Sequence, residues 1–464
     1  MLKTNTYGVY YIAFCFKWVL YAGISLATSN ALAAKDEMAG LHHQMQHLRE
    51  QMQQTQELYK SQINVLEQRI LELEKANNYQ QRNNTLPVAS VPESDEHHSQ
   101  PAGFQWSLSG LVAMGGSTAN GNELKQLQAG AHDPRKNGFT IQALSLAVHA
   151  RFNEQLDATA SIVSHIEPDG ESLVELEQAF IQAQGLTDNL SVKAGQYFLD
   201  FGEENTRHPD DWDFVDVPFL ITRLFGGDKL RSQGIHLTWQ TPMPWRSTLS
   251  LGISNPVGET ATSFLYEQGE TVGGHVLLAR DVESPGDLLY LLKWSHRLPV
   301  AGPHHIGFGA SALFGPNATG DSTDTQIYGL DFEWTKYANA HSQKPLFNWR
   351  TELMLRRYEA GDNNDPTHET LKDYGLFSQA VWQLDNKWAL GLRAEYADSN
   401  GGKVNDPLRD NRKRLSLNIT RPLAKSVKWR LQYNHDRDNT LSDNNADSVW
   451  LQLVYQAGSH NEHE

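Results

Sequence analysis

Residues 104–457 repeat one pattern, in which segments of about ten residues alternate apolar and polar side chains and end at turn residues. In residues 387–396, for example, Trp388, Leu390 and Leu392 share one face, while Lys387 and Arg393 fall on the other. A period of two places alternate side chains on opposite faces of a β-strand. The repeat therefore predicts a large sheet with one apolar face and one polar face.

Sixteen such segments can be counted, the twelfth of them beginning near Tyr374. Sixteen is an even number, as single-chain bacterial barrels require. Short connections at residues 153–154 and 385–386 take turns with long polar connections at residues 116–138 and 256–285. Outer-membrane barrels have short periplasmic turns and long extracellular loops. The predicted fold is an all-β transmembrane barrel of 16 antiparallel strands, porin-like, with its termini on the periplasmic side. A soluble β-sandwich is the alternative, but its loops show no such alternation.

The first 33 residues resemble a secretory signal peptide. Lys3 precedes an apolar stretch, and Ala31-Leu32-Ala33 provides a small-residue cleavage site. A single membrane anchor is the alternative. Cys15, the one cysteine, lies inside this segment, so the mature chain is expected to have neither a disulfide nor a lipid anchor. The net charge of −16 argues against nucleic acid as a partner, because nucleic acid needs a basic surface.

Residues 34–77 are predicted to form a periplasmic α-helical coiled coil before the barrel. Apolar residues recur there at spacings of three and four, as at Leu41, Met45 and Leu48. His43 and His47 would share one face of this helix, so a metal-collecting tract and a solvated surface are both open. Residues 78–103 are polar and rich in Asn, Ser and Pro, which is typical of a flexible linker. Residues 458–464 form a C-terminal tail after the barrel, residues 104–457.

Five short motifs resemble the phosphate-selective porin (O and P type) superfamily: residues 194–198, 201–202, 208–216, 225–227 and 234–237. More closely, they resemble a branch of uncharacterised outer-membrane proteins with an N-terminal coiled coil, some of them zinc-regulated. The resemblance implies a homotrimer of barrels, each narrowed by a third loop that folds inward.

The third long connection, residues 199–230, fits that inward loop by position and length. Its candidate constriction residues are Glu203, Glu204, Arg207, His208, Asp210, Asp211, Asp213, Asp216 and Arg223. Phosphate-selective members use ladders of Arg and Lys, so this acidic balance departs from their pattern. A second departure is the C-terminus, which continues past Tyr455 and does not end on an aromatic residue.

Water-facing positions of the later strands form a second candidate surface, which we call the basic wall. Its residues are Arg350, Arg356, Arg393, Arg412, Arg414, Lys428 and Arg430. An acidic loop facing a basic wall across water would create a transverse field that selects small polar solutes. The alternative is that these are hydrated interior charges, balanced by Asp331, Glu333, Glu352 and Glu395.

The predicted function is an outer-membrane porin that allows passive diffusion of small hydrophilic solutes or ions, with outer-membrane lipid around it. No cofactor is expected, and no enzyme, since no Gly-x-Ser-x-Gly elbow is present and His368-Glu369 lacks a second His. One alternative is binding or uptake of zinc or another divalent metal. The histidines that could serve it are His208, His304, His305, His460 and His463. The other alternative is a barrel anchor for a structural coiled coil.

Overall fold

The computed structural model describes residues 103–458, except residues 188, 301, 340–343, 363–364, 386, 402–405 and 407–408. The predicted signal peptide, coiled coil and nearly all of the linker lie outside these residues, as does the tail beyond residue 458. Among the described residues, no helix is long and apolar enough to cross a membrane.

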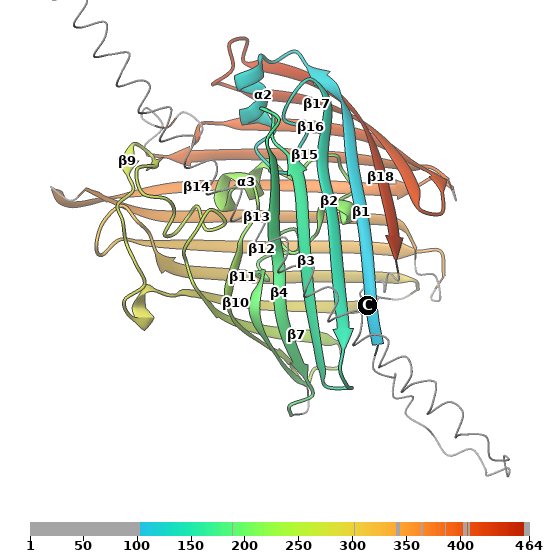
Figure 1. Ribbon diagram of the computed structural model, residues 1–464, viewed down its shortest axis with the longest axis horizontal. Coiled ribbons are helices and arrows are strands. Elements are labelled where there is room, and N and C mark those ends of the chain that lie inside the picture. The colour runs from blue at the N-terminus through green and yellow to red at the C-terminus, as the bar shows by residue number, and fades with distance from the viewer. Residues whose placement is uncertain are drawn as a thin grey trace, which may run out of the picture. The chain divides into compact units, whose positions relative to one another are not determined.

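Sixteen antiparallel strands of the described residues close into one barrel (Figure 1). Each strand pairs with the next along the chain, and β1 pairs with β18 to complete the ring. The strands are β1 (Gly103–Ser117), β2 (Gly138–Arg151), β3 (Leu156–Ile166), β4 (Ser172–Gln184), β5 (Leu190–Phe198), β6 (Arg231–Gln240), β7 (Arg246–Ser254), β10 (Leu289–Val300), β11 (His304–Pro316), β12 (Asp324–Tyr337), β13 (Pro345–Asp362), β14 (Asp365–Gln383), β15 (Ala389–Asn400), β16 (Arg412–Ala424), β17 (Val427–Asp438) and β18 (Asn445–Gly458).

The predicted fold class and strand number are confirmed, and the connections do alternate between short turns and long loops. The largest difference in strand position is β14, which begins at Asp365, whereas the periodicity placed its start near Tyr374. Pairing of the β13–β14 hairpin continues as far as Asp362 and Asp365. Backbone pairing needs no apolar alternation, so the sequence pattern missed this extension.

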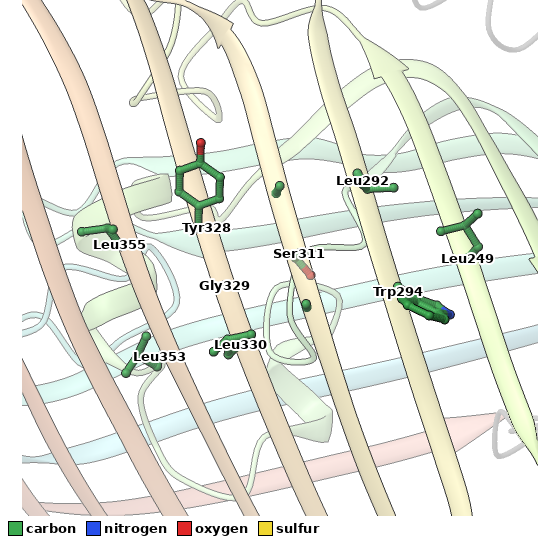
Figure 2. A pocket seen from close by; sticks show the side chains of 11 residues that line it. Leu249, Leu292, Trp294, Ser311, Tyr328, Gly329, Leu330, Leu353 and Leu355 are labelled. Carbon is green, nitrogen blue, oxygen red and sulfur yellow. The ribbon is translucent and has the colours of Figure 1, made fainter.

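The outward face of the barrel is apolar, as a membrane-spanning barrel requires. Leu330 on β12 is 59% exposed, whereas its inward neighbour Asp331 is 8% exposed. Small Ala310 and Ala312 leave a shallow apolar groove among larger outward side chains of β7 and β10–β13 (Figure 2). Aromatic side chains gather near the strand ends, with Tyr290, Phe314 and Tyr328 at the loop end and Trp334, Phe347 and Trp382 at the turn end.

In the part of the chain that the structure describes, three loops carry short helices or strands of their own. The first contains α2 (Gly121–Leu127), whose N-terminus is closed by a capping box between Asn120 and Glu123. The fourth contains β8 (Thr271–Val272), β9 (His275–Val276) and η2 (Pro285–Asp287). The third, residues 199–230, contains η1 (Pro209–Asp211) and α3 (Phe219–Phe225). α3 contacts β14 and β15, and its residues Leu220 and Phe225 share a buried cluster with Phe377 and Ala397 of those strands, so the third loop folds into the barrel (Figure 1).

Candidate functional site

The first part of the third loop is fixed to the inner faces of β10, β11 and β13. Lys293 Nζ donates to Asp200 Oδ1 at 2.7 Å and to the Gly202 carbonyl at 2.6 Å. Glu352 Oε1 accepts the backbone N–H groups of Glu203 at 2.9 Å and Glu204 at 2.7 Å. A carboxylate that receives two backbone N–H groups makes charge-assisted hydrogen bonds. Residues 200–204 are therefore held against the barrel wall.

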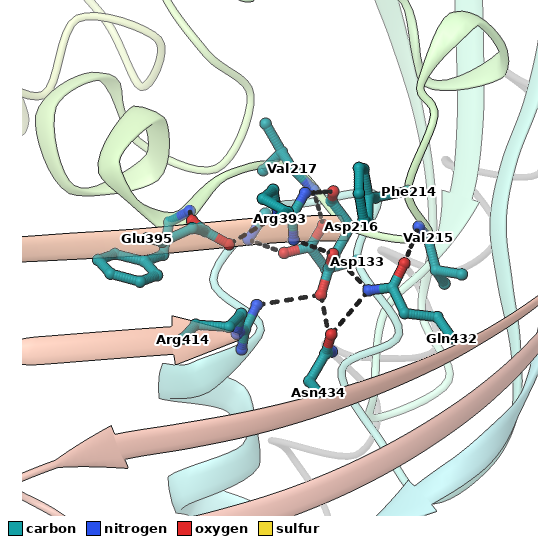
Figure 3. A network of polar contacts seen from close by, with 12 residues as sticks. Asp133, Phe214, Val215, Asp216, Val217, Arg393, Glu395, Arg414, Gln432 and Asn434 are labelled. Carbon is teal, nitrogen blue, oxygen red and sulfur yellow. Dashed lines mark hydrogen bonds and ion pairs between the residues drawn. The ribbon is translucent and has the colours of Figure 1, made fainter. Parts of the chain in front are cut away.

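A second attachment of the loop is Asp216, which lies among side chains of β15, β16 and β17 (Figure 3). Its Oδ2 lies 3.0 Å from Arg414 Nη1 and accepts from Asn434 at 3.1 Å. Its Oδ1 pairs with Arg393 and accepts from Gln432 at 2.8 Å. The Asp216 side chain is fully buried. Burial alone would raise the pKa of Asp216, but the two guanidinium groups hold it at about 2.

Backbone carbonyl groups beside Asp216 attach the loop further to the barrel. Arg430 Nη1 donates to the Phe214 carbonyl at 2.9 Å, and Asn418 Nδ2 donates to the Asp213 carbonyl at 2.8 Å. The Asp213 side chain pairs with Arg350, and Lys428 Nζ reaches the Asp210 carbonyl at 3.3 Å. Residues 210–216 thus follow the inner faces of β13–β17.

Two residues of the basic wall, Arg412 and Arg356, are paired with carboxylates of the barrel itself. Arg412 lies 3.1 Å from Asp436 and also donates to the Leu127 carbonyl of the first loop at 2.6 Å. Arg356 lies 2.7 Å from Asp373. Together with the contacts above, every residue of the basic wall has a partner.

The structure corrects the expectation that an acidic loop and a basic wall face each other across water. Asp213 and Asp216 touch the wall directly, at Arg350, Arg393 and Arg414. A charge that leaves water loses much hydration energy, which a close partner of opposite sign offsets. The loop is long enough to bring that partner to the wall, so the two surfaces meet.

Four other loop residues were singled out in the sequence. Arg207 lies 3.5 Å from Asp213, and the Asp210 side chain accepts a hydrogen bond from Gln456 of β18 at 3.2 Å. Asp211 is exposed. Arg223, on α3, donates to the Asp410 carbonyl of the seventh loop at 2.9 Å, away from the wall.

His208 faces β4 on the other side of the barrel. Its Nδ1 lies 3.0 Å from Glu177 Oε2, and its ring packs edge-on against Phe198. Burial alone would lower the pKa of His208, but the Glu177 carboxylate raises it above the usual range. The loop therefore crosses from the β10–β13 wall to β4 before it returns to β13–β17.

Apolar packing fills the space between the loop and the inner faces of β10–β15, which the sequence analysis treated as polar. The buried cluster joins loop residues such as Phe201, Leu220 and Phe225 to inward-facing strand residues, namely Leu291, Leu313, Ile327, Met354, Phe377 and Ala397. A sequence signal was present, because residues 353–355 of β13 are apolar on both faces. Such a run indicates a strand covered on both sides.

Several residues that contact the basic wall or the third loop were not singled out from the sequence. They are Asp373, Asp436, Gln432, Asn434 and, in the first loop, Asp133. The four strand residues lie on the same inward face as the arginines of β13–β17, so alternation alone could have found them. Asp133 carried no such signal, because its contact with the third loop depends on how two loops meet.

Asp133 gives a pH-dependent contact between the first and third loops. Its Oδ1 accepts from Val217 N at 3.0 Å, and its Oδ2 accepts from Gly130 N at 2.9 Å. Burial, followed by repulsion from Asp216, raises the pKa of Asp133 to about 7. The folded state therefore binds a proton that the unfolded chain has released, so this group's contribution to stability falls as pH rises from about 4 to about 7.

We expect the thermal unfolding temperature of the wild type to fall more between about pH 5 and about pH 8 than that of Asp133→Ala. Unfolding can be followed by the loss of the heat-modifiable folded band on a gel. The variant lowers stability at both pH values, because two N–H groups lose their acceptor, so only the difference in slope is informative. Equal slopes for the two proteins would contradict the assignment.

Among the described residues, no group of three or more His, Cys, Asp or Glu side chains is arranged to hold a metal ion. His304 and His305 begin β11 at a short turn, far along the strand from the loop end. Within those residues, the histidines proposed as metal ligands therefore do not converge with His208. His460 and His463 lie outside the described residues.

No protein-family model matches this chain. An uncharacterised protein of Aquifex aeolicus (strain VF5) is 28% identical over 319 residues, which cover 64% of this chain and 64% of that protein. The chain thus spans less than two thirds of that relative's length.

Two solved structures match this chain at low sequence identity. The outer membrane channel DcaP of Acinetobacter baumannii is 12% identical, with a TM-score of 0.49 over 79% of this chain and 100% of that one. The anion-selective porin from Comamonas acidovorans is 9% identical, with a TM-score of 0.47 over 76% and 98% of the two chains. The fold of this chain rests on its own strand pairing.

Proposed function

We propose that this protein is an outer-membrane channel for passive diffusion of small hydrophilic solutes or ions, narrowed by its third loop. The observation that carries the proposal is a closed 16-strand barrel with an apolar outer face, a charged inner face and an inward-folded loop. An apolar outer face is compatible with the lipid around the barrel. A charged inner face is compatible with water inside the barrel.

The loop acts as a fixed constriction. Its carboxylates at Asp213 and Asp216 are held by the basic wall, and its first residues are held by Glu352 and Lys293. A segment held at several points keeps a defined width while solutes pass beside it. Transport by this route needs no energy source and no covalent step, so we propose a channel and no enzyme.

The setting of the channel is also a proposal. The apparent signal peptide at residues 1–33 would export the chain, and the long loops would face outside, which places the N-terminus in the periplasm. The coiled coil predicted at residues 34–77 would then lie in the periplasm and favour a homotrimer of barrels.

The test is single-channel recording of the purified full-length protein in planar lipid bilayers. We expect stepwise conductance from protein whose folded state is verified by its heat-modifiable gel mobility. Conductance that appears equally with heat-unfolded protein would be an artefact, so that sample is the control. Absence of steps from folded protein would reject an open channel and leave the anchoring role as the better account.

A further inference from the structure

A basic patch lies on the outside of the barrel at the turn end of β14–β17. We call it the basic rim, and it consists of Lys387 in the β14–β15 turn, Arg421 near the end of β16 and Lys425 in the β16–β17 turn. Lys387 and Lys425 are exposed, and Arg421 is half-buried. The chain as a whole carries a net charge of −16, so this excess of positive charge is local.

Asp385 is the one carboxylate among the described residues of these two turns and the adjoining strand ends. Its Oδ1 accepts the backbone N–H groups of Lys387 at 2.6 Å and Trp388 at 2.7 Å, which closes the β14–β15 turn. Within the described part of the chain, Lys387, Arg421 and Lys425 form no ion pair with a carboxylate. Asp385 therefore offsets at most one of the three positive charges of the basic rim.

Two tryptophans fix the position of Arg421. The rings of Trp388 and Trp429 pack edge-on, with their centroids 5.7 Å apart. The Arg421 guanidinium lies 4.8 Å from the centre of the Trp388 ring, and Arg421 is directly opposite Trp429 in the strand register. Stacking on an aromatic ring uses the face of the guanidinium and leaves its N–H edges available to an anion.

The basic rim lies at the edge of the apolar outer surface. Farther from the turns, the same outward face carries Leu390, Ile419 and Leu431, which are opposite one another in the strand register. Leu390 and Leu431 are 39% and 41% exposed. Tryptophan side chains in a transmembrane barrel mark the boundary between hydrocarbon and lipid head groups. The cations beside Trp388 and Trp429 therefore lie at the depth of lipid phosphate groups.

We propose that the basic rim binds an anionic phospholipid, with its phosphate on Arg421 and the two lysines and its acyl chains along Leu390 and Leu431. Lysine and arginine side chains near a membrane surface attract anionic lipids, and the planar guanidinium matches the geometry of a phosphate group. The inference goes beyond the channel function, because it requires the barrel to lie in a membrane but requires no open pore. Under the proposed orientation, this lipid belongs to the periplasmic leaflet.

The experiment measures lipid binding to the purified full-length protein by native mass spectrometry, with phosphatidylglycerol and phosphatidylcholine of the same acyl chains. We expect the wild type to bind phosphatidylglycerol more tightly, because the choline group cancels the charge of its own phosphate. Arg421→Gln and Lys425→Gln are each expected to lower the affinity for phosphatidylglycerol about fivefold, since each removes one cation near the membrane surface. The matched controls are Arg437→Gln and Lys372→Gln, because these cations are exposed at the opposite end of β17 and β14.

Lower affinity in both rim variants, with unchanged affinity in both controls, supports the inference. Equal affinity of the wild type for the two lipids would overturn it, and so would an equal fall in the loop-end controls. Displacement of the lipid by inorganic phosphate would also overturn it, because the site would then recognise the free ion. None of these results depends on conductance, so they leave the channel function to its own test. If Arg421→Gln does not fold, Lys425→Gln, in an exposed turn, tests the same charge effect.

Discussion

Asp216→Ala is expected to release the third loop from the basic wall and to widen the channel. The substitution leaves Arg393 and Arg414 beside a cavity and removes one of the two acceptors of Gln432 and of Asn434. Removal of one partner from a buried ion pair costs about 3–5 kcal/mol, because the other charge stays buried and uncompensated. Arg414 keeps its contact with Asp436 at 2.9 Å, and Arg393 keeps its contact with Glu395 at 2.8 Å, which places the expected loss toward the lower end of that range.

Single-channel conductance and the unfolding temperature on gels measure the two consequences. We expect larger or noisier conductance steps and a lower unfolding temperature than in the wild type. Asp211→Ala is the matched control, because Asp211 belongs to the same loop and carries the same charge but is exposed. Unchanged conductance and stability in Asp216→Ala would show that the ion pairs do not hold the loop.

Phe201→Ala is expected to loosen the same loop through apolar packing. The Phe201 ring is fully buried, packs against Phe225 with ring centroids 5.4 Å apart, and occupies space that Gly329 leaves open on β12. Loss of a buried phenylalanine side chain costs about 3–5 kcal/mol. We expect conductance to rise and protease to cleave residues 199–230 faster, while the barrel strands stay intact.

The matched control for this change is Phe308→Ala on β11, whose side chain is 42% exposed on the outward face. It removes the same atoms from the lipid side and should leave conductance and loop cleavage unaltered. If both variants behave alike, the apolar cluster does not support the loop. The double variant Asp216→Ala/Phe201→Ala then tests coupling, because two attachments of one loop are not expected to act independently.

The outward face and the strand count followed from the sequence because each depends on local rules. A strand beside lipid must alternate, so residues 387–396 revealed a strand without reference to any other segment. Even the third loop could be located, since its length exceeds that of the neighbouring turns. The arginines of β13–β17 were assigned to the lumen by the same alternation, and the structure places Arg393 and Arg414 there.

The partners of those arginines depended on the tertiary structure. Asp216 lies 177 residues before Arg393 in the chain, and no periodicity states which way a loop of this length turns. The apolar inner surface at Ile327, Met354 and Phe377 likewise has meaning only when α3 lies on it. The burial of Asp331 and Glu352 was not predicted from the sequence either, because the cross-strand register brings them together and the folded loop buries them. The sequence alone determined a barrel with a charged interior, because alternation is set residue by residue. Which charges cancel and which remain was decided by long-range packing of the loop, where burial makes every unpaired charge costly.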